Sequence, residues 1–310
     1  MKLIRGLYNI QPEHRGSVAT IGNFDGIHRG HQAVIRQLHE LARRLDCDTT
    51  VITFDPLPRE YFMGDKAPAR LTTLREKFIQ FDRLGVDQML TMPFNARLAE
   101  MTAQQFIDDV LVRGLAIRAL VVGDDFRFGK GREGDFEMLR RAGEHYGFEV
   151  IDTETVSDEQ GRISSTRIRD ALAAGDLETA ATLLGRPYSM SGTVIHGEKL
   201  GRTIGFPTAN IHIRRTVSPL RGVFAVEVEC IGYGVTNVGT RPTVDGKGFL
   251  IETHLLDFDG DLYGQHINIR WLKKLRSERK FDSLDALKAQ IARDIDAARA
   301  YFSQLESQTN

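Results

Sequence analysis

Two hydrophobic patterns divide the chain into two parts. From residue 17 to about residue 150, short apolar runs alternate with segments in which apolar residues recur every three or four positions. Their alternation is typical of a parallel sheet with crossover helices. The predicted strands are residues 17–22, 49–54, 87–92, 119–123 and 148–153, and the predicted helices between them are residues 32–45, 73–84, 102–115 and 135–146.

The second pattern begins after two short predicted helices, residues 164–173 and 176–184, which we expect to close the first domain. Beyond them the chain has β runs punctuated by Gly, Pro and Asp-Gly turns, which indicates a small antiparallel barrel. We therefore expect an α/β domain at residues 1–186 and a β-barrel domain at residues 187–310. The predicted barrel strands are residues 188–196, 209–212, 222–230, 234–239, 250–256 and 265–272, and a long final helix covers residues 283–305.

The composition is that of a globular protein with balanced charge. The 310 residues include 41 Lys and Arg against 42 Asp and Glu, so the formal net charge is -1. Neither half has the basic excess that neutralises a polynucleotide, and a small anionic ligand is the better expectation. Cys47 and Cys230 are far apart in the sequence, which argues against a disulfide scaffold. No apolar run is long enough for a signal peptide or a membrane span. We expect a cytoplasmic protein that binds neither membranes nor nucleic acids.

The clearest candidate for phosphate binding follows the first predicted strand. Residues 22–31 read Gly-Asn-Phe-Asp-Gly-Ile-His-Arg-Gly-His and lead into a helix, whose free backbone N–H groups and dipole attract phosphate. His28 and His31 are three residues apart, so on a first helical turn both lie on one side and can donate to phosphate oxygens. We expect a triphosphate to be held here for attack at its α-phosphorus, because positioning and charge stabilisation carry most of phosphoryl catalysis.

Two further segments of the first domain carry polar groups beside predicted strands or helices. Residues 123–129, Gly-Asp-Asp-Phe-Arg-Phe-Gly, follow a strand at the sheet edge where ligands of such folds collect, although an ordinary turn has the same pattern. Residues 163–169 place hydroxyl groups and Arg167 at a helix start. That arrangement suits the β- and γ-phosphates of a nucleotide, and a simple helix cap with surface arginines is the alternative.

Together these motifs resemble the FMN adenylyltransferase half of the bacterial bifunctional riboflavin kinase/FAD synthetases, within the HxGH nucleotidyltransferase superfamily. The resemblance implies a Rossmann-like fold in which the FMN phosphate attacks the α-phosphorus of Mg-ATP and expels pyrophosphate. At Asp55 and Leu57 the chain departs from the Glu and His that are common in that family. The implied ATP-binding residues are Gly22, Asn23, Phe24, His28, His31, Ser164, Ser165 and Arg167, with His28 and His31 catalytic, and the implied flavin-binding residues are Asp125, Phe126 and Phe128.

A second glycine-rich segment lies in the predicted barrel. Gly197, Gly201 and Gly205 are spaced four apart and precede Phe-Pro-Thr-Ala-Asn at residues 206–210. Such a loop can wrap phosphates with its backbone N–H groups, while Thr208 and Asn210 offer the hard oxygen ligands that Mg²⁺ prefers. The glycines alone fit a plain barrel turn equally well.

A strand glutamate is the candidate general base of the second domain. A kinase that acts on a primary alcohol gains from a carboxylate that orients the hydroxyl and accepts its proton. Glu252 lies in an alternating run, Leu-Ile-Glu-Thr-His-Leu at residues 250–255, where a solvent-facing charge is the simpler alternative.

The Pro-Thr-Ala-Asn segment and the strand glutamate resemble riboflavin kinases, and the order of motifs matches the bifunctional family from about residue 16 to residue 297. The resemblance implies that riboflavin and ATP give FMN and ADP in this domain, and that FMN then becomes FAD in the other. We expect Mg²⁺ with ATP, and a monomer or weak homo-oligomer. The implied residues are Glu252 as base, Gly197, Lys199, Gly201 and Gly205 for ATP, Thr208 and Asn210 for Mg²⁺, and Arg276 and Phe281 for flavin.

Two other interpretations remain open from the sequence. One is a nucleotidyltransferase with another acceptor, such as pantetheine phosphate or nicotinate mononucleotide, joined to an unrelated barrel; the Pro-Thr-Ala-Asn segment counts against it. The other is a regulatory module that binds flavin or nucleotide, or a barrel that binds RNA. The barrel lacks an obvious basic, aromatic-rich strand face, which disfavours RNA.

Overall fold

The computed structural model describes residues 1–153, 155–197, 205–213, 215–241 and 248–309, and these form two compact units. The first unit comprises Met1–Pro68 and Leu74–Ser164, and the second comprises Ala69–Thr73 and Ser165–Asn310. The two short helices before the barrel, α7 (Ser165–Ala174) and α8 (Leu177–Leu184), therefore group with the second unit. The boundary of activities between residues 186 and 187 stays a prediction.

A parallel sheet forms the centre of the first unit, as predicted, and it has six strands where five were expected. Its strand order is β1-β4-β3-β2-β5-β6, and every neighbouring pair is parallel. The strands β2 and β5 at its centre are buried along their whole length, which explains their near-continuous apolar runs. The strands are β1 (Lys2–Arg5), β2 (Val18–Ile21), β3 (Thr49–Phe54), β4 (Gln88–Met92), β5 (Ala119–Val122) and β6 (Glu149–Asp152).

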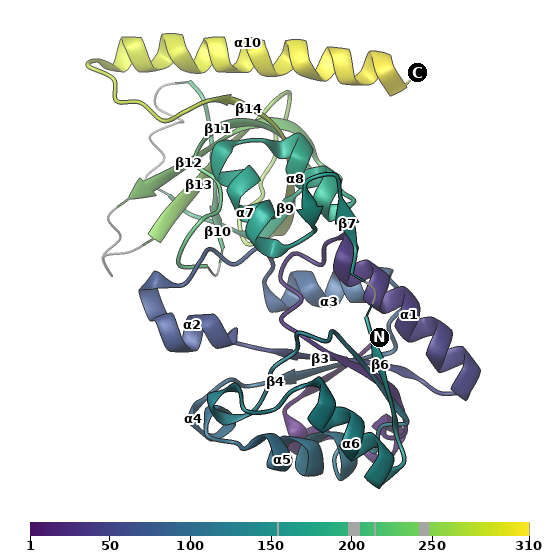
Figure 1. Ribbon diagram of the computed structural model, residues 1–310. Helices are drawn as coiled ribbons and strands as arrows, with labels where there is room; N and C mark the ends of the chain where they lie inside the picture. The colour runs from purple at the N-terminus through teal and green to yellow at the C-terminus, as the bar shows by residue number, and fades with distance from the viewer. Residues whose placement is uncertain (154, 198–204, 214, 242–247, 310) are drawn as a thin grey trace. The chain divides into compact units, whose positions relative to one another are not determined.

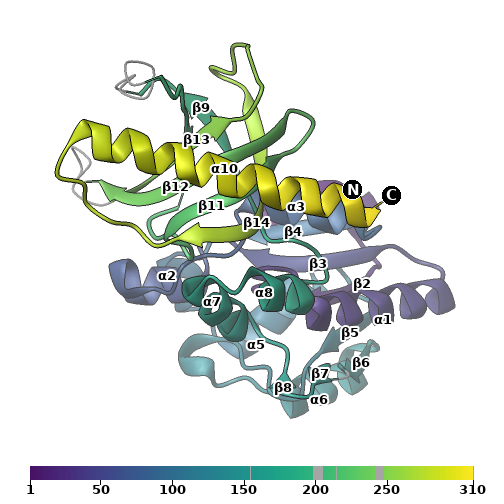
Figure 2. The ribbon, with the colours of Figure 1, turned by 90° about the horizontal axis from the view of Figure 1, so that it is seen from above.

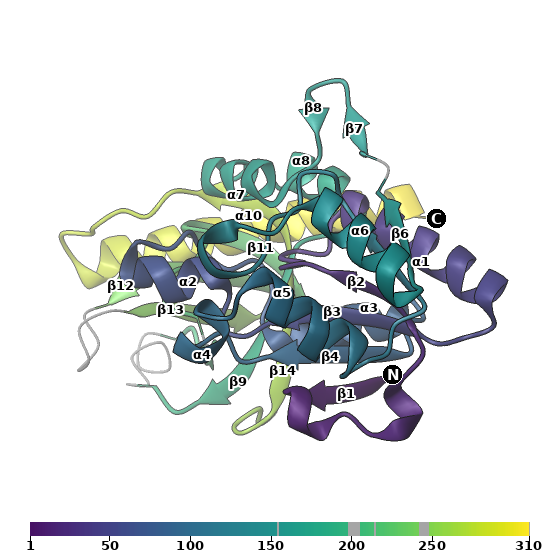
Figure 3. The ribbon, with the colours of Figure 1, turned by 60° about the horizontal axis from the view of Figure 1, so that its bottom comes forward.

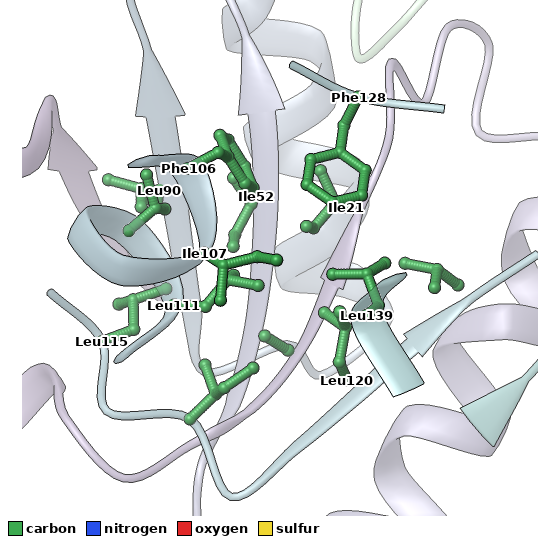
Figure 4. Close-up of a cluster of buried hydrophobic side chains, with 14 of the residues drawn as sticks. Ile21, Ile52, Leu90, Phe106, Ile107, Leu111, Leu115, Leu120, Phe128 and Leu139 are labelled. Atoms are coloured by element: carbon green, nitrogen blue, oxygen red, sulfur yellow. The ribbon is translucent and has the colours of Figure 1, made fainter. Parts of the chain in front are cut away.

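Helices cover both faces of this sheet (Figure 1). Successive side chains of a strand point to opposite faces, so Val51 packs under α1 (Arg29–Leu45) and α3 (Leu74–Arg83), and Ile52 packs on the other side. There it meets α5 (Ala103–Phe106), the π-helical turn η4 (Ile107–Val112) and α6 (Phe136–Tyr146). Figure 4 shows this second layer, where Phe106, Ile107 and Leu111 lie over Ile52 and Leu90.

Several short elements of the first unit were not predicted. The edge strand β1 lacks a clear alternation of buried and exposed residues, because three of its four residues are exposed. A small hairpin, β7 (Ser157–Asp158) with β8 (Gly161–Arg162), projects from the unit (Figure 3). The single helix expected at residues 102–115 is instead α5 followed by η4, and it ends at Val112. The remaining short helices are α2 (Pro58–Met63) and α4 (Ala96–Ala99).

The second unit contains the predicted antiparallel barrel. Its six strands close in the order β10-β13-β12-β11-β14-β9, and β9 pairs with both β10 and β14. The final helix α10 (Leu284–Thr309) crosses β11, β12 and β14 (Figure 2), where Phe302 stacks on Tyr233 with ring centroids 4.2 Å apart. The strands are β9 (Ser189–Ile195), β10 (Ala209–His212), β11 (Gly222–Val228), β12 (Gly232–Arg241), β13 (Gly248–Leu255) and β14 (His266–Arg276).

Candidate functional site

The connection from β2 to α1, residues 22–31, is called here the β2–α1 loop, and its backbone is strained. Phe24 and Ile27 have φ values of 46° and 45°, and Gly26 has φ 92°. For a bulky residue this left-handed conformation costs of order 1–3 kcal/mol, and surrounding structure must hold it. The side chains of Phe24 and Ile27 are 2% and 0% exposed, so the core fixes the loop from behind. The loop is therefore presented in one backbone conformation at the carboxyl edge of the sheet.

The two candidate histidines lie together at the start of α1. His28 is the N-cap, and its Nδ1 accepts a hydrogen bond from the backbone N–H of His31 at 3.3 Å. Because Nδ1 accepts, the neutral His28 ring carries its proton on Nε2, which can donate. The two rings stack with centroids 3.7 Å apart. Gly30 allows this packing, since a Cβ there would lie 3.1 Å from ring atoms of His28.

The segment after β5 gives its three candidate flavin residues different surroundings. Asp125 is exposed and forms an ion pair of 2.6 Å with Arg162 from β8. Phe126 is half-buried and stacks against Phe128 with centroids 5.6 Å apart. Phe128 is 7% exposed and its ring also meets Phe106, so it belongs to the core shown in Figure 4. Of these two rings, Phe126 has more surface for a ligand, and the flavin roles stay predictions.

The sequence interpretation missed an exposed aromatic cluster at the same sheet edge. It consists of Phe54 at the end of β3, Phe94 after β4, and Tyr61 and Phe62 on α2. Neighbouring rings meet edge to face with centroids 5.2–5.8 Å apart, and Tyr61 and Phe62 are 41% and 67% exposed. We call these four residues the aromatic cluster.

A signal for α2 was present in the sequence. Pro58 occupies the first helical turn, where proline is favoured because its missing N–H is not needed. Glu60 accepts a hydrogen bond from the backbone N–H of Leu57 at 2.8 Å, as in a capping box. Leu57 itself is 7% exposed and packs into the interior, and Asp55 is half-buried.

The remaining nucleotide candidates of the first domain lie around the start of α7. Ser164 is the last residue of the first unit, whereas Ser165 and Arg167 lie in the first turn of α7 in the second unit. All three side chains are half-buried. A helix start offers backbone N–H groups to an anion, so the phosphate role of these residues stays a prediction.

On the barrel, strand register brings the kinase candidates together. Glu252 on β13 lies directly opposite Asn210 on β10 and opposite Asn237 on β12. Directly paired residues share a face of a sheet, so these three side chains form one row, called here the strand triplet. Ile251 and Thr253 on either side are buried inside the barrel, which places the triplet on its outer face. The pairing of β12 with β13 adds Asn237 to this row, a placement that the sequence pattern alone does not show.

Contacts fix the Pro-Thr-Ala-Asn segment beside the strand triplet. The carbonyl oxygen of Pro207 lies 2.8 Å from Nδ1 of His254, and Thr208 is half-buried next to it. A Cβ on Gly197 would lie 2.1 Å from the amide nitrogen of Asn210, so any other residue there would displace the Asn210 side chain. Gly205 has φ 89°, which requires glycine. Lys199 and Gly201 lie outside the described residues.

Of the two flavin candidates near the end of the barrel, Arg276 contacts the last helix and Phe281 contacts Arg276. The Arg276 guanidinium forms a two-pronged ion pair with Asp294 of α10, with N–O distances of 2.8–3.0 Å. The Arg276 and Asp294 side chains are 20% and 6% exposed. The Phe281 ring lies under the guanidinium groups of Arg276 and Arg279, at 5.7 and 4.7 Å. The structure thus gives both residues a packing role, and their flavin role stays a prediction.

Comparison with known proteins gives matches over both units. A family model for FAD synthetase matches residues 10–167, and a model for riboflavin kinase matches residues 184–302. A bifunctional riboflavin kinase/FMN adenylyltransferase from Escherichia coli is 54% identical over 97% of this chain and 98% of its own length. The protein of the same description from Haemophilus influenzae is 48% identical, covering 98% of this chain and all of its own.

The chain belongs to the family of bifunctional riboflavin kinase/FMN adenylyltransferases.

A solved structure has the same fold as this family member. It is a Streptococcus pneumoniae protein described as a macrolide-efflux protein, with TM-score 0.81 and 34% identity, over 96% of this chain and 99% of that one. Both enzymatic domains of the family are present in the chain, and the motifs of both units fall within the matched ranges. Within the described ranges, no helix is long and apolar enough to cross a lipid bilayer.

Proposed function

We propose that each unit of this enzyme carries one of two consecutive reactions. The enzyme phosphorylates riboflavin to FMN with ATP and then adenylylates FMN to FAD with release of pyrophosphate. The observation that carries the assignment is the division of family matches, FAD synthetase over residues 10–167 and riboflavin kinase over residues 184–302. Each range contains its own candidate phosphate site, so FMN is the product of one site and the substrate of the other.

The β2–α1 loop is proposed to hold ATP for adenylyl transfer. A phosphate oxygen of FMN attacks the α-phosphorus, and the bond to the bridging oxygen of pyrophosphate breaks. The first N–H groups of α1 and the Nε2 proton of His28 face the charge that builds on the phosphates, together with the His31 ring. These groups are already positioned, so little reorganisation is needed when the transition state forms.

The aromatic cluster is proposed to bind the flavin ring of FMN. An isoalloxazine is a large flat aromatic system, and offset or edge-to-face contacts with aromatic side chains stabilise it. Phe54 ends β3, the strand that neighbours β2, and Phe94 follows β4, the next strand beyond β3, at the carboxyl edge of the sheet. Exposed rings at Tyr61 and Phe62 leave surface for such a contact.

The strand triplet is proposed to perform riboflavin phosphorylation. Glu252 orients the terminal hydroxyl of the ribityl chain and accepts its proton as the oxygen bonds to the γ-phosphorus, and ADP leaves. Thr208 and Asn210 present oxygen atoms that fit a hard divalent cation, and in the part of the chain that the structure describes no cluster of three His, Cys, Asp or Glu competes for it. When bound, Mg²⁺ neutralises charge on the phosphates of ATP.

The direct test is the order in which products appear. Purified protein mixed with riboflavin and Mg-ATP should give FMN first and FAD later, separated by chromatography, with one ADP and one pyrophosphate per FAD. If riboflavin is consumed but FMN accumulates without FAD, the first unit uses another acceptor, and nicotinate mononucleotide or pantetheine phosphate would be tried in its place. The expected cytoplasmic location, weak self-association and lack of nucleic acid binding remain predictions.

A further inference from the structure

A fully buried lysine lies behind the β2–α1 loop. Lys77 is on α3, its side chain is 1% exposed, and its Nζ donates to the backbone carbonyl oxygen of Asn23 at 2.6 Å. The same ammonium lies 3.5 Å from the hydroxyl oxygen of Thr53 on β3. Burial of an ammonium group costs free energy, and lysine is among the residues least often buried. The buried position of Lys77 therefore needs a physical explanation.

The target of this hydrogen bond is the turn that receives ATP in the proposed function. Asn23 is itself exposed, and it lies between Gly22, whose N–H donates to Ile52, and Phe24, which has the strained φ of 46°. A strained backbone persists only where the surrounding structure determines it. A charge-assisted hydrogen bond to the Asn23 carbonyl is a strong constraint of that kind.

Helix α3 contacts this turn at a second point. Phe81 is one helical turn beyond Lys77, so both side chains lie on the same face of α3. The Phe81 ring meets the Phe24 ring edge to face, with centroids 5.3 Å apart. Helix α3 therefore fixes two consecutive residues of the loop, one through a carbonyl and one through a ring.

We propose that Lys77 is a positioning residue for adenylyl transfer, which holds the Asn23 carbonyl and through it the backbone that receives the triphosphate. The proposal rests on the assignment of ATP to the β2–α1 loop. The Lys77 side chain is 1% exposed, so it acts through the backbone that it holds and not directly on the substrate.

The variant Lys77→Met removes the ammonium and keeps most of the volume. We expect the rate of FAD formation from FMN to fall on the order of 100-fold, as for a small misplacement of groups that hold the reacting phosphate. The dissociation constant of Mg-ATP at this site should rise, while that of FMN changes less than about two-fold, because the aromatic cluster is untouched. Phosphorylation of riboflavin in the same preparation should keep its rate.

One further variant separates the hydrogen bond of Lys77 from its charge, and another serves as a control. Lys77→Gln keeps an N–H donor without the charge, so it should recover part of the rate that Lys77→Met loses. Arg75→Met is the matched control, because it removes one positive charge from the exposed side of the same helix and should leave both activities as they are. Circular dichroism and thermal unfolding of each variant report whether the first unit is folded.

Each outcome decides the proposal. If Lys77→Met forms FAD at the wild-type rate with unchanged ATP affinity, Lys77 does not position the loop. If every variant that loses FAD formation also loses FMN binding or the folded first unit, the lysine has only a structural role and the proposal is likewise overturned. A wild-type protein that makes FMN but no FAD contradicts the proposed function itself, and is recognised before any variant is assayed.

Discussion

The β2–α1 loop and the strand triplet position polar groups by different physical means. In the loop, a short stretch of strained backbone is held from behind by buried side chains, and most of its groups come from neighbouring residues. In the triplet, Asn210, Asn237 and Glu252 are distant in sequence, and only the register of three strands places them in one row. A local motif therefore identifies the first site, whereas the second depends on how the barrel closes.

The sharpest test of this comparison uses variants that each remove one of the two activities and leave the other unchanged. Glu252→Gln removes the proposed base and keeps the shape of the side chain, so riboflavin phosphorylation should fall by a factor of about 100 to 10,000. Conversion of supplied FMN to FAD should be unchanged. Replacement of both His28 and His31 with Ala should do the reverse, with a loss of about 100-fold or more. Chromatography of flavin products measures both, and loss of both activities in each folded variant would contradict separate sites.

A glycine substitution tests whether strand-based positioning tolerates disturbance. Gly197→Ala places a Cβ 2.1 Å from the Asn210 amide nitrogen, so the amide must move. We expect riboflavin phosphorylation to fall by about 100-fold, because displacement of a positioning group by one ångström has effects of that size. Gly264→Asn is the control: φ there is +77°, which Asn tolerates, and no atom lies within 4 Å of the added Cβ. Equal rates of riboflavin phosphorylation in the two variants would show that the position of the Asn210 amide does not affect this reaction.

The aromatic cluster gives a smaller effect at the first site. Phe62→Ala removes a ring that is 67% exposed, so folding should be nearly unaffected. We expect KM for FMN in FAD formation to rise by roughly 10-fold, because an aromatic contact is worth about 0.5–1.5 kcal/mol beyond its area. Tyr8→Ala removes another exposed ring, 84% exposed and outside the cluster, and should change nothing. An unchanged KM in Phe62→Ala would place the flavin elsewhere.

A helix cap in the second unit should affect stability without affecting chemistry. Asp176 caps α8, and hydrogen bonds from the hydroxyl and backbone N–H of Thr179 lower the pKa of its carboxyl group. Asp176→Ala should cost about 1 kcal/mol of folding free energy. Because the pKa is lowered in the folded state, the carboxylate's contribution is complete above its unfolded pKa of about 3.9 and is lost as the pH falls further. The difference in unfolding free energy between wild type and variant, measured with urea, should therefore be larger at pH 7 than at pH 3.

Burial explains why one strand of the first sheet was predicted and another was missed. β3 was predicted at its observed bounds because five of its six residues are buried, while β1 was missed because only Ile4 is. At the first site, His28 and His31 were found because a helical turn brings residues three apart together. Lys77 was missed for the opposite reason: it is 54 residues from Asn23, and no local pattern links them. Long-range register and packing decide such contacts, and periodicity does not describe them.

The ring of the barrel is completed by its last strand, because β14 pairs with both β11 and β9, the first strand. A ribosome must therefore deliver residues 266–270 before β9 can find its neighbour on that side. Until then, β9 and β11 each have an open edge that can recruit another chain. The sheet of the first unit has all six strands once residue 152 has emerged. During translation on a polysome, strand edges that can aggregate are therefore open for very different lengths of time in the two units.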